Sequence, residues 1–233
     1  MRRRIAADRD AVNRWEAVVN LRNVVSLTSV AFHAGVPIAV WGRSHRSRGA
    51  RTFAWWLALS GATSVAGFAM ALTGTHNIKL FLAYQLCSAL LMSLTGYRLL
   101  SGPRQRRLVV VCATVYALFW LVMIVSGIEA RDWLSSYTNP GEQIVLLLVG
   151  ILLVAESIRI SDRSPMRHAE GWIGLGLVIA AGTGIAMSPI TAEIARHSAA
   201  QAAVLRQITQ GFTLIALILW CIPYWKRGVT WTR

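Results

Sequence analysis

The sequence predicts an all-α fold, a polytopic integral membrane bundle of seven transmembrane helices with the N-terminus outside and the C-terminus cytoplasmic. Of the 233 residues, 55% are hydrophobic, and the mean hydropathy is +0.49. The charged residues, 15% of the chain, are confined to short patches between long apolar runs. Because these runs are about 20 residues long, each of them is able to cross the hydrocarbon core of a bilayer.

The last apolar run, residues 203–225, is the clearest of these spans. Its interior, residues 211–220, is continuously apolar, whereas a surface helix of a soluble protein carries a polar face. The run ends in Trp225, Lys226 and Arg227, and an aromatic anchor followed by positive charge is typical of a cytoplasmic helix end.

The other spans follow in chain order, separated by polar patches and helix-breaking residues. Pro37 predicts a kink near the end of the first span, and Ser-Gly-Pro at 101–103 separates the third from the fourth. The longest loop, 129–141, ends in an Asn-Pro-Gly turn signal, and a short linker of one or two helical turns is expected at 193–201. The six spans are residues 21–41, 53–73, 78–100, 108–128, 142–160 and 171–190.

Three segments make up the expected domain organisation. Residues 1–20 are a basic N-terminal segment, whose apolar side chains share one helical face and allow a short interfacial helix. Residues 21–225 form the seven-span membrane domain, and residues 226–233 form a basic cytoplasmic tail.

The distribution of Lys and Arg sets the expected orientation. Outside the N-terminal segment, most of them lie in the loops 43–51, 98–107 and 159–167 and at the C-terminus, which the positive-inside rule places in the cytoplasm. The arginines before the first span oppose this orientation, so a first span that does not fully cross remains an alternative. We expect a multi-pass protein of the cell membrane, with the bacterial cytoplasmic membrane as its location.

The net charge of +14 is explained by the same rule, so we expect the lipid bilayer and not nucleic acid as the partner. The chain carries no motif of a zinc protease, serine hydrolase or nucleotide-binding loop, and nothing assigns it to a family. Glu156 lies in the fifth span, one turn before Arg159, which predicts a structural ion pair. We expect a protein that is not an enzyme and holds no metal or other cofactor.

A band of polar residues at the outer ends of the spans is the candidate ligand-binding site. Arg206, Gln210 and Thr213 are three or four residues apart, so they share one helix face, and Glu142 and Gln143 begin the fifth span in the same leaflet. The alternative is interhelical hydrogen bonding that only stabilises the bundle, at about 0.6 kcal/mol per pair. The candidate residues are Arg206, Gln207, Gln210, Tyr84, Gln85, Asn23 and His33.

The sixth span carries a ridge of small residues at four-residue spacing, Gly176, Ala180, Gly184 and Ser188. Such ridges let helices approach closely. We expect the ridge to pack inside the same bundle, and the alternative is a homodimer or another membrane protein bound through Gly176, Ala180 and Gly184.

These patterns favour a small non-enzymatic membrane protein, sensor- or receptor-like, that binds a small polar ligand or partner from the outer leaflet side. One alternative is a transporter or channel that uses the same polar band, which would need a polar path through to the cytoplasm. Another is a structural or partner-binding subunit of a membrane complex.

Overall fold

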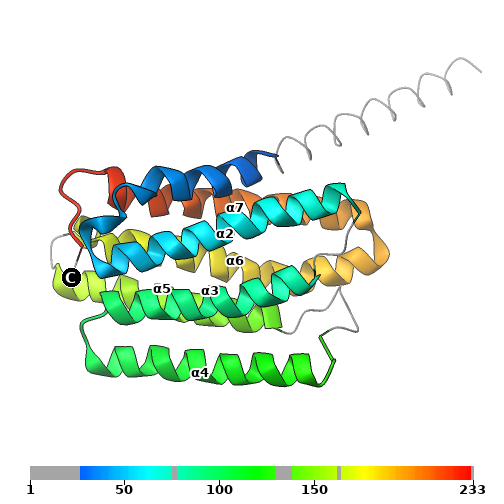
Figure 1. Ribbon diagram of the computed structural model, residues 1–233, viewed down its shortest axis with the longest axis horizontal. Coiled ribbons are helices and arrows are strands. Elements are labelled where there is room, and N and C mark those ends of the chain that lie inside the picture. Colours follow the sequence, from blue (N-terminus) through cyan, green and yellow to red (C-terminus); the bar gives the residue numbers. More distant parts are fainter. Residues whose placement is uncertain (1–26, 75–77, 130–137, 162–163, 232–233) are drawn as a thin grey trace, which may run out of the picture.

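The computed structural model describes residues 27–74, 78–129, 138–161 and 164–231 (Figure 1). The helices are Leu27–Trp41, α2 (Arg48–Leu72), α3 (Ile78–Leu99), α4 (Pro103–Val125), α5 (Thr138–Ile160), α6 (Ala169–His197) and α7 (Ala199–Trp225), with the short 3-10 turns η1 (Ser44–Arg46) and η2 (Pro165–Arg167). Six of them are long and apolar enough to cross a membrane, and Leu27–Trp41 is a shorter apolar helix. The prediction of an all-α membrane bundle with seven helices is therefore confirmed within the described residues. The expected interfacial helix in residues 1–20 and the start of the first span lie outside them.

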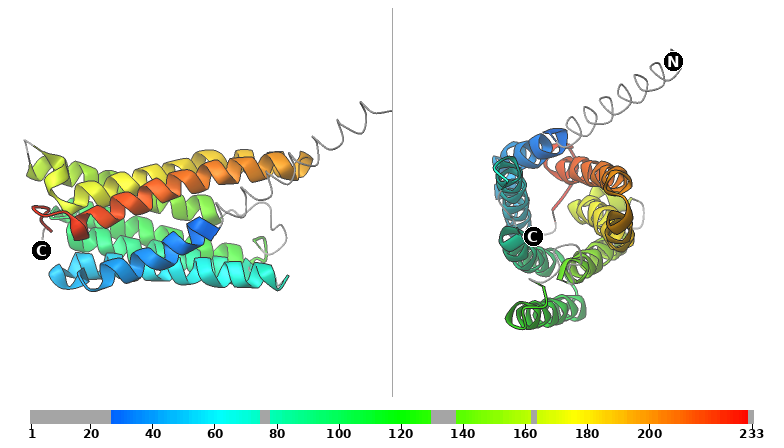
Figure 2. Two further views of the ribbon diagram at one scale, coloured as in Figure 1. Left: turned by 90° about the horizontal axis from the view of Figure 1, so that it is seen from above. Right: turned by 90° about the vertical axis from the view of Figure 1, so that its right-hand side faces the viewer.

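Viewed along the bundle, six helices form a ring, and α4 lies outside it against α3 and α5 (Figure 2, right). Much of the apolar surface of α4 is exposed, as at Val115 (61%), Val122 (62%) and Val125 (78%). Lipid tails are as apolar as these side chains, so this surface suits contact with the bilayer. The arrangement leaves α4 as a peripheral helix and gives the interior of the ring to the other six.

α5 and α6 approach each other closely through two glycines. A Cβ atom built on Gly174 would lie 2.6 Å from the carbonyl oxygen of Gly150 and 2.9 Å from the backbone nitrogen of Val154. A Cβ on Gly150 would in turn lie 3.0 Å from the carbonyl oxygen of Gly174. Backbone meets backbone here, which is the arrangement that small residues permit between membrane helices.

The Leu27–Trp41 helix packs against α2 in a similar way. A Cβ on Gly61 would overlap the carbonyl oxygen of His33 and lie 3.2 Å from Cγ of Pro37. Glycine at this position therefore lets the short first helix complete the ring.

The prediction of a turn at residues 139–141 is wrong, because α5 begins at Thr138 and includes these three residues. Pro140 lies in the first turn of the helix, where a backbone N–H has no partner within the helix and its loss costs nothing. An Asn-Pro-Gly sequence is compatible with a turn or with the start of a helix, and in this protein it forms the start of a helix.

The linker at residues 193–201, expected to hold one or two helical turns, is helical for most of its length. α6 continues to His197, supported by Glu193, whose carboxylate forms an ion pair with Arg196 at 2.9 Å and lies 3.4 Å from His197. Only Ser198 separates α6 from α7, and its side chain accepts the N–H of Gln201 as the N-cap of α7.

The predicted ion pair between Glu156 and Arg159 is present, with an N–O distance of 2.8 Å. The buried Glu156 carboxylate also accepts the backbone N–H of Ser101 at 3.2 Å and its hydroxyl at 2.5 Å. Because Ser101 lies in the connection between α3 and α4, Glu156 fixes that connection to α5. This geometry agrees with a structural role.

Residues 226–231 of the expected tail fold back onto the start of α6. The Thr230 N–H donates to the carbonyl of Arg167 at 2.9 Å, and the Thr230 carbonyl accepts the N–H of Ala169 at 2.9 Å. The Trp231 ring packs 5.0 Å from that of Tyr224. This part of the chain is thus held against the bundle.

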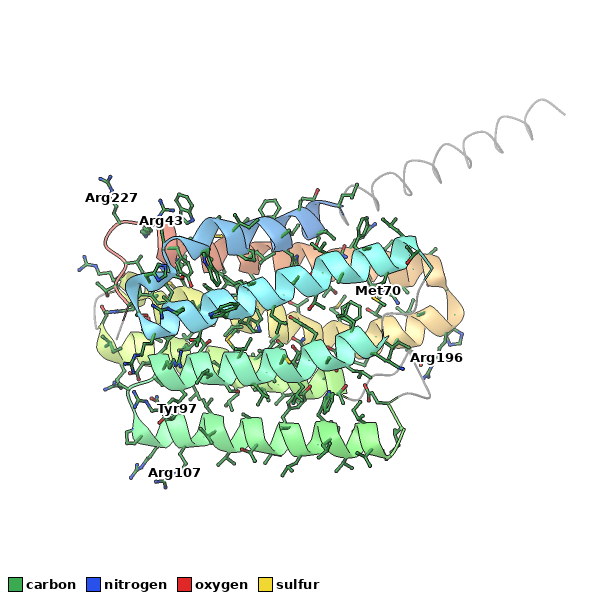
Figure 3. All side chains as sticks on the ribbon, in the orientation of Figure 1. Arg43, Met70, Tyr97, Arg107, Arg196 and Arg227 are labelled. Atoms are coloured by element: carbon green, nitrogen blue, oxygen red, sulfur yellow. The ribbon has the colours of Figure 1, made fainter. Side chains whose placement is uncertain are left out.

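Basic side chains gather at one end of the molecule, called the basic end below. Arg43, Arg107 and Arg227 lie there, whereas Arg196 lies at the opposite end (Figure 3). The guanidinium of Arg43 is 3.4 Å from the ring centroid of Trp225, a cation–π contact. Aromatic and basic residues at one helix end match an interfacial belt.

Candidate functional site

The ring of six helices encloses a cavity of about 490 Å³. Every helix of the ring lines it, and α4 does not. The volume falls within the range of about 300–1,000 Å³ that small-molecule sites occupy. The polar and ionisable lining residues, tryptophans aside, are His33, Ser60, Tyr84, Asn139, Glu142, Gln143, Ser188, Thr191, Arg206, Thr209, Gln210 and Thr213.

The cavity lies toward the end opposite the basic end. Asn139 belongs to the first turn of α5, Thr191 to the last turns of α6, and Arg206 to the early turns of α7. A span of about 20 residues, counted back along α7 from Trp225, reaches the neighbourhood of Arg206. The mouth of the cavity is therefore near the boundary of the hydrocarbon core, and its deeper part is within that core.

Four of the predicted ligand-binding residues come together at this cavity: His33, Tyr84, Arg206 and Gln210. Gln207 follows Arg206 directly, but it is not among the residues that line the cavity. Asn23 lies outside the described residues. Whether any of these residues binds a ligand stays a prediction.

Gln85, the remaining predicted residue, is buried away from the cavity in a hydrogen-bond cluster at the start of α5. Its Oε1 atom lies 2.6 Å from the Thr138 hydroxyl, which also lies 2.7 Å from Oε1 of Glu129. The Tyr116 hydroxyl donates to the Thr138 carbonyl at 3.2 Å. Gln85 therefore joins α3 to the start of α5, as the alternative of interhelical stabilisation expected.

Glu142 is the most unusual residue at the cavity. Its side chain is fully buried, and its Oε1 atom makes no hydrogen bond within the described part of the protein. Ser88 lies beside the carboxylate and also beside the Tyr84 hydroxyl. Since Ser88 already accepts the indole N–H of Trp56 at 2.9 Å, its own hydroxyl hydrogen is free to be donated.

Arg206 lies at the mouth and is exposed. Among the described residues, no ion pair or hydrogen bond involves its guanidinium. Thr209 and Thr213, on the same wall, donate their hydroxyls to backbone carbonyls one turn earlier in α7, at 3.1 Å in both cases. The α7 wall therefore offers a cation without a partner in the described residues, at the mouth of the cavity, and hydroxyl oxygens that are still able to accept hydrogen bonds.

The deep end of the cavity is closed by aromatic rings. Trp56 and Trp220 line it and meet edge to face with centroids 5.0 Å apart, and Phe53 packs 5.6 Å from Trp56. The indole N–H of Trp220 donates to the carbonyl of Ile173 at 3.2 Å, which holds the ring in place. This floor separates the polar cavity from the basic end.

The ridge of α6 faces the inside of the ring. A Cβ on Gly176 would overlap the indole of Trp220, and Ala180, Gly184 and Ser188 line the cavity. This placement favours packing within the bundle over a homodimer. The ridge also leaves space, because larger side chains at these positions would fill the cavity.

Several lining residues are absent from the predicted set. Glu142 and Gln143 had a signal in the sequence, namely their place in the polar band, but were not counted as ligand-binding residues. Ser188 was singled out only as a member of the ridge of small residues, and Ser60 and Thr191 had no signal that separates them from other small polar residues in spans. Their place at the cavity depends on helix rotation, which only packing determines.

Compared with models of protein families, with curated proteins and with solved structures, the chain gives no match. In the described residues, no group of three or more His, Cys, Asp or Glu side chains comes together that could hold a metal ion. The cavity must therefore be interpreted from its own chemistry.

Proposed function

We propose that this protein is a small sensor- or receptor-like module of the membrane, which binds a small polar ligand in the cavity between its helices. The observation that carries the proposal is that two ionisable side chains at one cavity have unpartnered polar atoms within the described residues: Oε1 of buried Glu142 and the guanidinium of exposed Arg206. Polar groups in a membrane interior are costly, so those without internal partners suggest an external one.

The aromatic floor weighs against a transporter or channel. Transport through this cavity would need a polar path toward the basic end, and there the lining passes from Glu142 to Trp56, Leu177 and Trp220. Below them lies Phe53, which is fully buried and packs against both tryptophan rings. A cavity that aromatic rings separate from the basic end is suited to binding rather than to passage. The other alternative, a structural subunit of a membrane complex, would leave the cavity without a ligand. A ligand-binding test therefore distinguishes this alternative from the proposed function.

The proposed orientation places the cavity mouth outside the cell, because the loops of the basic end would be cytoplasmic. Reporter fusions at residues 46, 104 and 228 should therefore report the cytoplasm, and a fusion at residue 76 should report the outside. An external reporter at residue 104 would reverse the orientation. A fusion at residue 1 that reports the cytoplasm would mean that the first helix does not fully cross.

The ligand test compares a variant that fills the cavity with a matched variant on the same helix. Ser188→Phe places a ring inside the cavity, whereas Ala186 is exposed, so Ala186→Phe directs the same ring toward lipid. Thermal unfolding in detergent is measured with four pools at millimolar concentration: amino acids, amines without a carboxylate, carboxylic acids without an amine, and uncharged sugars and nucleosides.

At least one pool is expected to raise the melting temperature of the wild type and of Ala186→Phe by several degrees, because ligand that binds only the folded state stabilises it. Ser188→Phe should show no such shift. If no pool shifts the wild type, or if Ser188→Phe responds like the wild type, the proposed function is wrong.

A further inference from the structure

We infer that the ligand carries a protonated amino group and that the carboxylate of Glu142 binds it. This inference rests on the proposed function, and it adds the chemical class of the ligand. The observation is a carboxylate oxygen that is buried, borders the cavity, and has no hydrogen-bond partner within the described residues.

A buried carboxylate oxygen without a donor is costly, and most buried polar atoms in proteins are paired. The protein had donors available nearby. Arg206 lines the same cavity, yet no ion pair joins it to Glu142. Gln143, the next residue of α5, directs Oε1 toward Gly184 of α6. The open coordination of Glu142 is thus a feature of the folded bundle, and a donor that enters the cavity would complete it.

The surroundings of Glu142 suit an ammonium group. Trp56, Tyr84 and Trp220 line the same cavity, and aromatic rings attract a cation through their electron-rich faces. Ser60 and Ser88 lie beside the Tyr84 hydroxyl, and hydroxyl oxygens accept hydrogen bonds. A protonated amine has three N–H donors, which allows one bond to Glu142 and others to neighbouring hydroxyls.

The remainder of the ligand extends toward the mouth, where Arg206 and Gln210 lie. A ligand with a carboxylate, such as an amino acid, would place it near the guanidinium, which binds carboxylates by a planar pair of donors. An amine without a carboxylate would use only the deep half of the site. Both kinds of ligand carry the ammonium group that Glu142 would bind. Only the amino acid carries a carboxylate that Arg206 would bind.

The test uses the wild type first. Leucine, 3-methylbutylamine and 4-methylpentanoate share a 3-methylbutyl group. Leucine carries both an ammonium and a carboxylate, 3-methylbutylamine carries only the ammonium, and 4-methylpentanoate carries only the carboxylate. Each compound of the amino acid and amine pools that raises the melting temperature is compared with its deaminated counterpart in the same way. The inference predicts that removal of the amino group abolishes the shift.

Glu142→Gln then tests the residue, with Glu193→Gln as the control, because Glu193 is exposed and lies outside the cavity. Affinity for the amine-bearing compound is expected to fall by about 30-fold or more in Glu142→Gln and to be unchanged in Glu193→Gln. Without ligand, Glu142→Gln should unfold at the same temperature as the wild type or higher, since a buried carboxyl group with one unpaired oxygen is replaced by an uncharged amide of the same shape.

The outcomes separate the two proposals. A shift produced only by the acids or by the uncharged pool would overturn the ammonium inference and leave the proposed function standing. So would unchanged amine affinity in Glu142→Gln. No shift with any pool would overturn both. If Arg206→Gln binds the amino acid more weakly than the wild type does but binds the amine equally well, the ligand is zwitterionic. If Arg206→Gln and the wild type bind the amino acid with equal affinity, the ligand is a simple amine.

Discussion

Gly174→Leu is expected to be the most destabilising single substitution in α6, with a loss of more than about 3 kcal/mol in the free energy of unfolding. The reason is that the new side chain would meet the backbone of Gly150 and Val154 in α5, and backbone has no rotamer by which to yield. α5 and α6 would have to separate, and both of them line the cavity.

The control for this prediction is Gly182→Leu on the same helix. A Cβ on Gly182 has no atom within 4 Å, so the same substitution there should change stability by no more than about 0.5 kcal/mol. Gly184→Leu should be intermediate, because its Cβ would meet only the flexible end of Gln143 at 3.0 Å. Unfolding in mixed detergent micelles measures all three. Equal losses in Gly174→Leu and Gly182→Leu would contradict the close contact of α5 with α6.

Trp220→Ala is the second substitution with a large expected effect. Its ring is 3% exposed, covers Gly176 and packs against Phe53 and Trp56, so truncation should leave a void and cost about 3–5 kcal/mol. The floor of the cavity would also be lost, which should weaken any ligand that rests on it.

Trp55→Ala provides the matched comparison, because Trp55 precedes Trp56 in α2 and points to the outer surface with 52% exposure. Its loss should cost about 1 kcal/mol or less. Thermal unfolding of Trp220→Ala and Trp55→Ala without ligand measures the two losses of stability. If Trp220→Ala is no less stable than Trp55→Ala, the aromatic floor is not packed as described, and the argument against a transport path is lost with it.

The ligand-binding residues show how far sequence reasoning reaches. Arg206, Gln210 and Tyr84 were predicted from their polarity within apolar spans, and all three line the cavity. Gln207 and Gln85 are equally polar, but one lies off the cavity and the other completes a cluster with Thr138. Polarity indicates that a residue needs a partner, and it does not indicate which partner.

Helix ends show a similar division. The break at residues 101–103 was predicted correctly, because Gly102 precedes α4 and Pro103 occupies its first turn. The same residue types at 139–141 were misread as a turn, since local signals for a helix start and for a loop overlap.

The sequence by itself determined the class of the protein and the number of apolar helices, because the length and continuity of an apolar run suffice to define a membrane helix. It also determined the local ion pair of Glu156 with Arg159, whose spacing of three residues is set by the helix. Tertiary structure alone decided that α4 lies outside the ring, that Gly150 meets Gly174, and that Glu142 borders a cavity with one oxygen that has no partner among the described residues. These features depend on the rotation and order of helices around the ring, and contacts between residues far apart in the chain determine both.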